Sequence, residues 1–314
     1  MTDPPSVHVR VEGRAGCITL DRPRALNALN IEMIRGMCQA LDAFEQDAQV
    51  TRIIIDSASP KAFCAGGDIR AVAALAAEGR YDEAHRFLAE EYVLDRRIAE
   101  SAKPCVALID GYALGGGLGI SVNGRYRVVT ERATLAMPET IIGCFPDVGS
   151  SHFLSRLSSH VGEWLGLSGA FIGGADAAVI GLATHFVSSA RLASLRQALV
   201  DSSCDTENVL SQYREEPHSF RIAALLPQID AVFSGVTVTE MMTRLARSGT
   251  DWGRETLAQL EASSPSSLEV TLQLIRAGVS STLSECLDRE LEAAWHRVRH
   301  PDLVEGVRAQ LVDK

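Results

Sequence analysis

The sequence predicts an α/β fold, and three observations support this class. Two short apolar segments, 52–56 and 104–108, have the length and the isoleucine and valine content of buried strands. A glycine-rich turn follows each of them, at 61–69 and 109–119, and a helical pattern follows each turn. The chain has 314 residues, of which 46% are hydrophobic, so a core of good size is available.

The first part of the chain alternates between strands and helices. Residues 7–20 form a hairpin pattern, two short strands around a glycine-containing turn. Asn30 begins a helix whose apolar residues recur with the helical period. The other elements expected in this part are a strand at 52–56, helices at 69–79 and 81–101, a strand at 105–110, a helix at 116–123 and a strand at 126–130.

The later part of the chain is mainly helical. The polar stretch 201–219 is interpreted as a loop or an inserted segment. The elements expected around it are helices between 150 and 200, a short strand at 185–187, helical patterns over 220–262, a helix that begins at 263–265 and a helix over about 284–299. No linker or internal repeat separates independent domains. We therefore predict a core over residues 1–200 and a helical C-terminal region, 201–314, that packs on this core.

Composition limits the partners and the compartment. The net charge of −10 argues against a nucleic-acid partner. Seven scattered cysteines without a C-x-x-C pair favour free thiols in a reducing cytosol over a disulfide framework. Residues 1–6 lack a signal-peptide pattern, and no apolar run of about 18 residues predicts a membrane span. We therefore expect a cytoplasmic protein without a membrane partner. A homo-oligomer is compatible with this composition.

Two acids stand out in the segment 137–149. Glu139 and Asp147 each lie beside a proline, among residues that are otherwise apolar or small. Acidic side chains rarely occupy such surroundings unless they are paired or functional. Two carboxyl groups held in one loop by proline and glycine predict an acid/base pair or a nucleophile with a proton donor. The alternative is a solvated loop with two ordinary surface acids.

The two glycine-rich turns, 61–69 and 109–119, also allow two interpretations. Glycine lets the backbone approach a ligand closely, and a helix start offers unpaired N–H groups to negative charge. Two such groups that converge on one carbonyl oxygen form an oxyanion hole. The alternative is tight packing between strand and helix, which glycine also permits.

Other kinds of catalytic site lack their sequence signature. The chain has no G-x-S-x-G turn, no H-E-x-x-H helix, no G-x-x-x-x-G-K-[ST] loop and no G-x-G-x-x-G segment. The eight histidines are scattered, and His152, the one near the proposed chemistry, is interpreted as structural. No metal site and no metal or redox cofactor is therefore predicted.

Taken together, these segments resemble the crotonase, or enoyl-CoA hydratase/isomerase, superfamily. The resemblance begins with LDRPRALNAL at 20–29 and continues through both glycine-rich turns. Within the superfamily the chain is most similar to the 3-hydroxyisobutyryl-CoA hydrolase branch, to which three motifs point: AFCAGGDI at 62–69, MPETIIGCFPDVG at 137–149 and EGVRAQLVDK at 305–314. The resemblance implies a crotonase-like ββα spiral core with a helical C-terminal region.

The resemblance also implies roles for individual residues. Backbone N–H groups of Gly67 and Gly116 bind the thioester oxygen, Glu139 is the catalytic glutamate, and Asp147 is the second acid of the hydrolase branch. Coenzyme A is contacted by Arg24, Ala25, Leu26, Ala65, Gly66, Asp68 and Ile69. Among these, Arg24 is the expected phosphate partner, and Asp68 is expected to cap the following helix rather than to react.

The expected reaction follows from a departure within the family. By resemblance, hydratases carry a second glutamate at the position of Gly119 and a glycine at that of Asp147. This exchange favours hydrolysis of an acyl-CoA, with 3-hydroxyisobutyryl-CoA as the expected substrate, as in valine breakdown, and with coenzyme A present only as part of it. Glu139 either attacks the carbonyl or acts as general base. The alternatives are an enoyl-CoA hydratase or isomerase on the same fold, and a CoA-binding protein without catalysis.

Overall fold

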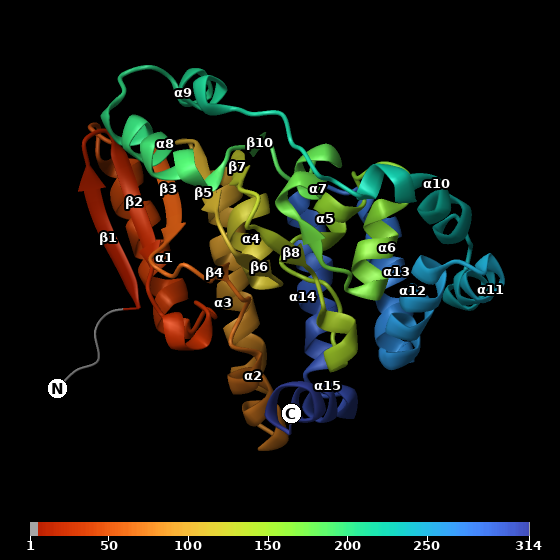
Figure 1. Cartoon of the computed structure of the whole chain (residues 1–314). Coiled ribbons are helices and arrows are strands. Elements are labelled where there is room, and N and C mark those ends of the chain that lie inside the picture. Colours follow the sequence, from red (N-terminus) through yellow and green to blue (C-terminus); the bar gives the residue numbers. More distant parts are fainter. Residues whose placement is uncertain (1–5, 314) are drawn as a thin grey trace. The chain divides into compact units, whose positions relative to one another are not determined.

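The computed structural model describes residues 6–313 (Figure 1). The segment 1–6 is therefore outside the described residues except for its last position, and so is the final residue of 305–314. The chain divides into two compact units whose segments alternate along the sequence. Unit 1 comprises 1–67, 93–135 and 172–220, and unit 2 comprises 68–92, 136–171 and 221–314. The division into 1–200 and 201–314 is a different partition and stays a prediction.

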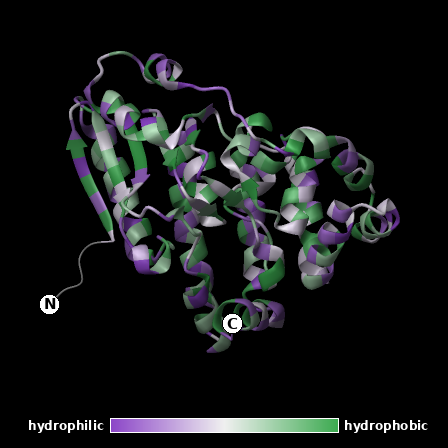
Figure 2. Ribbon diagram, viewed as in Figure 1, coloured by the Kyte–Doolittle hydropathy of each residue, from purple (hydrophilic) through white to green (hydrophobic). Residues whose placement is uncertain are grey.

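Unit 1 is built on a six-stranded sheet with strand order β1-β2-β3-β5-β7-β10. The strands are β1 (Val7–Glu12), β2 (Ala15–Leu20), β3 (Arg52–Ser57), β5 (Cys105–Ile109), β7 (Tyr126–Val129) and β10 (His185–Phe186). β1 and β2 are antiparallel, and each following pair is parallel. Hydrophilic and hydrophobic residues alternate along β1 in Figure 2, whereas β5 is buried along its whole length, as expected for an edge strand and a central strand.

Four shorter strands form a second sheet in the order β4-β6-β8-β9. They are β4 (Ala62–Cys64), β6 (Tyr112–Leu114), β8 (Thr134–Ala136) and β9 (Ile172–Gly173). The sequence did not predict them, because two or three residues are too few to establish an alternating pattern. β4 and β6 lie within the two glycine-rich turns, so each turn contains a strand before its glycines.

Helices connect the strands of unit 1. Those wholly in unit 1 are η1 (Pro23–Ala25), α1 (Ile31–Gln46), α4 (Gly116–Val122), α7 (Gly174–Val179), α8 (Ser189–Asp201) and α9 (Thr206–Tyr213). Asn30 caps α1 by accepting a hydrogen bond from the Met33 N–H at 2.9 Å, which confirms the predicted helix start. The predicted α/β class is likewise confirmed by these elements.

The helix α9 corrects the interpretation of 201–219 as a loop. Asp205 caps α9 by accepting from the Asn208 N–H, and Val209 and Leu210 are buried. These two side chains join a cluster formed by α8, α9 and the strands β2, β3, β5 and β7. A helix of eight residues with two deeply buried apolar residues is too short for its period to be recognised in a polar stretch.

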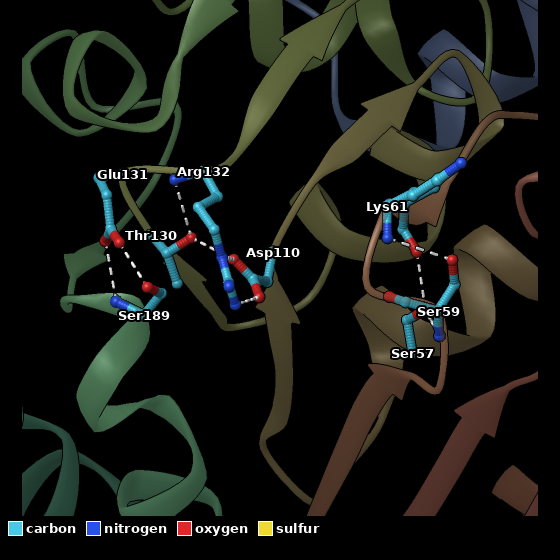
Figure 3. A network of polar contacts seen from close by, with 9 residues as sticks. Ser57, Ser59, Lys61, Asp110, Thr130, Glu131, Arg132 and Ser189 are labelled. Atoms are coloured by element: carbon cyan, nitrogen blue, oxygen red, sulfur yellow. Dashed lines mark hydrogen bonds and ion pairs between the residues drawn. The ribbon is translucent and has the colours of Figure 1, made fainter.

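Polar side chains fix the loops that lead into the glycine-rich turns (Figure 3). After β3, the hydroxyl oxygen of Ser57 accepts from the Ser59 N–H at 2.9 Å, and that of Ser59 accepts from the Lys61 N–H at 3.3 Å. After β5, the Asp110 carboxylate accepts from the Thr130 hydroxyl at 2.5 Å. Both turns therefore start from loops with a defined conformation.

Unit 2 is mainly helical. Its elements are α2 (Ile69–Ala77), η2 (Glu139–Ile142), α5 (Ser150–Leu154), α6 (Val161–Ser168), α10 (Ile222–Phe233), α11 (Val238–Ser248), α12 (Asp251–Ala262), α13 (Pro265–Gly278), α14 (Leu283–Arg297), α15 (Pro301–Val307) and the π-helical turn η3 (Arg308–Val312). The helix α3 (Tyr81–Glu100) contributes residues up to Tyr92. As predicted, Ser264 caps α13, whose Leu268, Leu272 and Ile275 are buried. Within residues 6–313, no helix has both the length and the apolar character needed to cross a membrane.

Candidate active site

The two glycine-rich turns of unit 1 lie against each other. A Cβ atom added to Gly66, whose φ is +101°, would lie 3.1 Å from the Leu114 carbonyl oxygen and 3.4 Å from the Gly116 nitrogen. A Cβ atom on Gly117 would lie 2.3 Å from the Cys64 carbonyl oxygen. Glycine is therefore required at both positions for the two backbones to approach each other. This packing brings the segments of Gly67 and Gly116 together.

The local geometry of these turns suits an anion-binding role. Gly116 is the first residue of α4 and follows Gly115, which has a φ of +50°. The first N–H groups of a helix have no partner within the helix. Gly67 pairs with Leu29 in an isolated bridge, which fixes its backbone. The assignment of Gly67 and Gly116 to an oxyanion hole stays a prediction.

The loop with Arg24, Ala25 and Leu26 is held beside the first glycine-rich turn. The Ala65 N–H donates to the Leu26 carbonyl oxygen at 3.0 Å, so the two segments predicted to contact coenzyme A are neighbours in unit 1. The Arg24 side chain is exposed at the end of η1 and available to a ligand.

Asn27 anchors this loop, although no sequence pattern singled it out. Its fully buried amide group donates to the Ser57 hydroxyl at 2.7 Å and to the Phe63 carbonyl oxygen at 3.0 Å. Its side-chain oxygen accepts from the Arg22 N–H at 2.7 Å. These bonds stabilise the positive φ angles of +50° at Leu26 and +58° at Asn27, which non-glycine residues adopt only at a cost.

In unit 2, Asp68 and Ile69 lie at the start of α2. The Asp68 side chain accepts from the Ala71 N–H, so its predicted role as a helix cap is confirmed. Ile69 is the first residue of the helix. Contact of these two residues with coenzyme A stays a prediction.

Glu139 and Asp147 are positioned by η2 and by the turn that follows it. The Glu139 carbonyl oxygen accepts from the Cys144 N–H at 3.0 Å. Cys144, Phe145 and Val148 are buried, so this segment is not the solvated surface loop considered as the alternative. Glu139 and Asp147 are half-buried as whole residues, and the Oε2 atom of Glu139 is itself buried. The Glu139 Oε2 atom has no hydrogen-bond partner among the described residues.

Two residues of α3, Glu91 and Tyr92, complete the cluster. The Tyr92 hydroxyl donates to Asp147 Oδ2 at 2.8 Å. Burial raises the pKa of Tyr92, and the charges of Asp147 and Glu290 raise it further, so the hydroxyl stays protonated and remains a donor. Glu91 is only 2% exposed, and its Oε1 atom has no hydrogen-bond partner among the described residues.

Burial raises the pKa of three acids, Asp147, Glu91 and Glu139. It raises the pKa of Asp147 to about 6, although the hydrogen bond from Tyr92 opposes the shift. Burial and the Asp147 charge raise the pKa of Glu91 to about 8. The pKa of Glu139 lies well above its ordinary value because of burial first, then Asp147, and also Glu91. The acids therefore titrate as a coupled group in which Asp147 ionises first, and an ionised Glu139 is a strong base for a carboxylate.

The sequence analysis missed Glu91, although a signal for it was present. Glu91 follows Phe87 by four residues and Leu88 by three, so it falls on the apolar face of the helix that those buried residues define. An acid on the buried face of an amphipathic helix indicates a functional group more strongly than an acid on the solvent face.

The C-terminal segment packs on the turn that carries Glu139. A Cβ atom on Gly306 would lie 2.5 Å from the Ile142 carbonyl oxygen, and one on Gly143 would lie 2.2 Å from the Asp302 carbonyl oxygen. Two glycines therefore let α15 contact η2 directly. The described part of the motif 305–314 is thus a structural neighbour of the loop that carries Glu139 and Asp147 within unit 2.

Glu91→Gln is expected to change the pH dependence of stability. Because the folded protein raises the pKa of Glu91 above its ordinary value of 4.5 to about 8, it binds this proton more tightly than the unfolded chain does. The wild type therefore loses stability as pH rises through this interval, and the glutamine variant lacks that loss. The Tm of the variant minus that of the wild type should increase between pH 5 and pH 8. Glu292→Gln, an exposed change on α14, serves as control. A difference that is constant with pH would contradict the assigned titration.

Neither His152 nor a group of metal-ligating side chains adds a further candidate site among the described residues. His152 lies in the last turn of α5, and burial lowers its pKa, with Arg156 adding to the effect. Across the described residues, no group of three or more histidine, cysteine, aspartate or glutamate side chains is arranged to hold a metal ion.

The sequence matches the family model described as Enoyl-CoA hydratase/isomerase over residues 15–314. The 3-hydroxyisobutyryl-CoA hydrolase, mitochondrial, of Xenopus laevis is 43% identical over an alignment of 312 positions that covers 96% of this chain and 80% of that protein. The Homo sapiens protein of the same name is 42% identical, with 96% of this chain and 81% of that protein covered. Such identity over nearly the whole chain supports a common fold.

A solved structure gives the same fold. The carnitinyl-CoA dehydratase from Mycobacterium thermoresistibile has a TM-score of 0.94 and 35% sequence identity, covering 98% of this chain and 90% of that chain. The predicted crotonase-like α/β fold is therefore confirmed. The activity in the name of this structure differs from that in the names of the two hydrolases, so the reaction has to be argued from the site residues.

Proposed function

Because this chain belongs to the enoyl-CoA hydratase/isomerase family, we propose that it hydrolyses 3-hydroxyisobutyryl-CoA to 3-hydroxyisobutyrate and coenzyme A. The protein is a CoA thioester hydrolase, the activity named for relatives that are 42% and 43% identical to it. The observation that carries the proposal is the acid cluster, in which burial first, and then the charge of Asp147, raise the pKa of Glu139. The Asp147 carboxylate in turn accepts from the Tyr92 hydroxyl. The residue at 119, where hydratases of the family are expected to carry a glutamate, is a glycine within α4.

Glu139 carries the central step of the reaction. In one route its carboxylate attacks the thioester carbonyl, the thiolate of coenzyme A leaves, and water cleaves the resulting mixed anhydride. In the other route Glu139 takes a proton from a water molecule that attacks the carbonyl directly. The raised pKa of Glu139 favours both, because it makes the ionised side chain a better nucleophile and a better base.

The two routes differ by a covalent intermediate. Rapid mixing with substrate followed by sodium borohydride reduces a mixed anhydride at Glu139 to an alcohol, which peptide mass spectrometry detects. The general-base route leaves the Glu139 side chain unchanged in the same experiment. A parallel sample without substrate controls for non-specific reduction.

Asp147 serves the substrate hydroxyl or the leaving thiolate. It ionises at a lower pH than its neighbours, and Tyr92 occupies its Oδ2 atom at 2.8 Å. The carboxylate can still accept a hydrogen bond from the 3-hydroxyl group of the substrate. This interaction provides a chemical basis for selecting a hydroxylated acyl group.

The remaining parts of the site are carried over from the resemblance. The N–H groups of Gly67 and Gly116 bind the thioester oxygen, and the loop at 24–26 together with the segment 65–69 binds coenzyme A. Thioester hydrolysis transfers no electrons, so we propose that no redox or metal cofactor takes part. Full activity of the enzyme after dialysis against EDTA is the expected result.

The function is tested by thiol release from a panel of acyl-CoA thioesters. With the purified protein, we expect kcat/KM for 3-hydroxyisobutyryl-CoA to exceed that for isobutyryl-CoA and butyryl-CoA by about tenfold or more, because only the first offers a hydroxyl group to Asp147. Equal values across the panel would contradict the proposed substrate while leaving the hydrolase activity in place.

A second candidate, a hydratase or dehydratase, has one specific observation in its favour, the name of the solved structure at 35% identity. The glycine at 119 argues against it, because hydration of an enoyl thioester in this family is expected to use two glutamates around one water molecule. The products formed from 3-hydroxyisobutyryl-CoA discriminate between hydrolysis and dehydration.

The cellular setting is a separate proposal. We place the reaction in valine breakdown, where this hydroxyacyl thioester is expected. The cytoplasm remains our proposal for the compartment, supported by seven scattered cysteines without a C-x-x-C pair, whereas the names of the relatives contain the word mitochondrial. Cell fractionation tests the compartment, and size-exclusion chromatography tests whether the protein forms a homo-oligomer.

A further inference from the structure

Glu290 forms an unusual set of contacts with the turn that follows Asp147. This residue lies on α14 and has no exposed surface. Its Oε2 atom accepts from the Gly149 N–H at 2.7 Å. Its Oε1 atom accepts from the Ser151 N–H at 2.9 Å and from the Ser151 hydroxyl at 2.5 Å. A buried carboxylate with three donors has a fixed position and in turn fixes its donors.

The turn that Glu290 holds has a strained backbone. Val148 has a φ of +55° and Gly149 a φ of +85°. A β-branched residue rarely adopts a positive φ, and such a conformation persists only where surrounding contacts stabilise it. The Ser150 N–H closes the turn by donating to the Asp147 carbonyl oxygen at 2.9 Å. Asp147 is therefore the residue from which this strained turn starts.

We propose that Glu290 is a positioning residue for Asp147. The Asp147 side chain is oriented by the Tyr92 hydroxyl, and its backbone by the turn that Glu290 holds. Loss of either contact lets the carboxylate move relative to the substrate. This inference rests on the proposed function, in which Asp147 contacts the substrate or the leaving group.

The chemistry of the contact explains why a carboxylate is needed at position 290. The Gly149 N–H donates to one oxygen of the side chain, and the Ser151 N–H and hydroxyl donate to the other. Glutamine offers one acceptor oxygen and one NH₂ group, so either the Gly149 N–H or the Ser151 N–H would face another donor. Burial raises the pKa of Glu290 to about 7, while the bonds from Ser151 and Gly149 oppose this shift because they stabilise the ionised carboxylate.

The test is a double-mutant cycle with Glu290→Gln and Asp147→Asn, measured by thiol release from 3-hydroxyisobutyryl-CoA. In the wild-type background, Glu290→Gln should lower kcat about ten- to a hundredfold, as expected for a displaced catalytic group. Binding of free coenzyme A should stay within about threefold, because the segments assigned to coenzyme A are unchanged. In the Asp147→Asn background, the same change should lower kcat no further. Glu292→Gln, an exposed change of the same charge on the same helix, should leave kcat unchanged.

Two results overturn the inference. The first is a folded Glu290→Gln variant with wild-type kcat, and the second is an equal loss of kcat in both backgrounds, which indicates a structural role that does not act through Asp147.

If Glu290→Gln does not fold, Ser151→Ala takes its place, since it removes only the hydroxyl donor to Glu290. The Ser151→Ala variant should lower kcat about twofold to tenfold in the wild-type background and should not lower it in the Asp147→Asn background. An unchanged kcat for Ser151→Ala in the wild-type background overturns the inference. Failure of the proposed function is distinguishable, because the wild-type protein itself would then release no thiol from this substrate.

Discussion

Glu139→Gln is expected to reduce kcat for 3-hydroxyisobutyryl-CoA by at least about a hundredfold, because glutamine can neither attack the carbonyl nor accept a proton. Folding and coenzyme A binding should remain close to those of the wild type. The Glu139 Oε2 atom has no hydrogen-bond partner among the described residues, so the substitution breaks no hydrogen bond of that atom within this part of the chain. Steady-state thiol release, circular dichroism and calorimetry of coenzyme A binding measure these three properties.

The exposed variant Glu292→Gln controls for the loss of one glutamate charge. If Glu139→Gln retained activity within a few-fold of the wild type, Glu139 would have no part in the chemical step. A large loss of coenzyme A binding would instead indicate that the variant is misfolded or that Glu139 binds the ligand.

Asp147→Asn is expected to affect hydroxylated substrates selectively. Asparagine keeps the shape of the side chain and an oxygen that can accept from Tyr92, but it removes the negative charge. A hydrogen bond from a substrate hydroxyl to a charged acceptor contributes about 1.5–3 kcal/mol. The kcat/KM for 3-hydroxyisobutyryl-CoA should therefore fall about ten- to a hundredfold more than that for isobutyryl-CoA.

The comparison between the two substrates separates the two roles of Asp147. Equal losses with both substrates would exclude recognition of the hydroxyl group and leave proton transfer to the leaving thiolate. No loss with either substrate would remove Asp147 from the site, and would also remove the basis for the role of Glu290.

Much of the fold follows from local sequence patterns. The helical period after Asn30, the apolar runs at 52–56 and 104–108, and the serine–proline start of α13 each predict an element that the structure contains. These signals depend on neighbouring residues alone. The short strands β4 and β6 were missed because their formation depends on pairing with each other.

The site shows the same division between local and distant information. Glu139, Asp147 and the glycines lie in motifs that are continuous in sequence, so their type and spacing could be recognised. Tyr92 and Glu290 act on the Asp147 segment from helices that are 55 and about 140 residues away. No sequence pattern links such residues, because their contact results from tertiary packing.

Product identification with 3-hydroxyisobutyryl-CoA tests the central claim most directly, because a hydrolase and a dehydratase convert this one substrate into different products. The purified protein is incubated with the thioester, and free thiol, 3-hydroxyisobutyrate and methacrylyl-CoA are quantified together by chromatography and mass spectrometry. Glu139→Gln serves as the inactive control. We predict equal amounts of free coenzyme A and 3-hydroxyisobutyrate, without accumulation of methacrylyl-CoA. Formation of methacrylyl-CoA without release of thiol would contradict the assignment of this site to thioester hydrolysis.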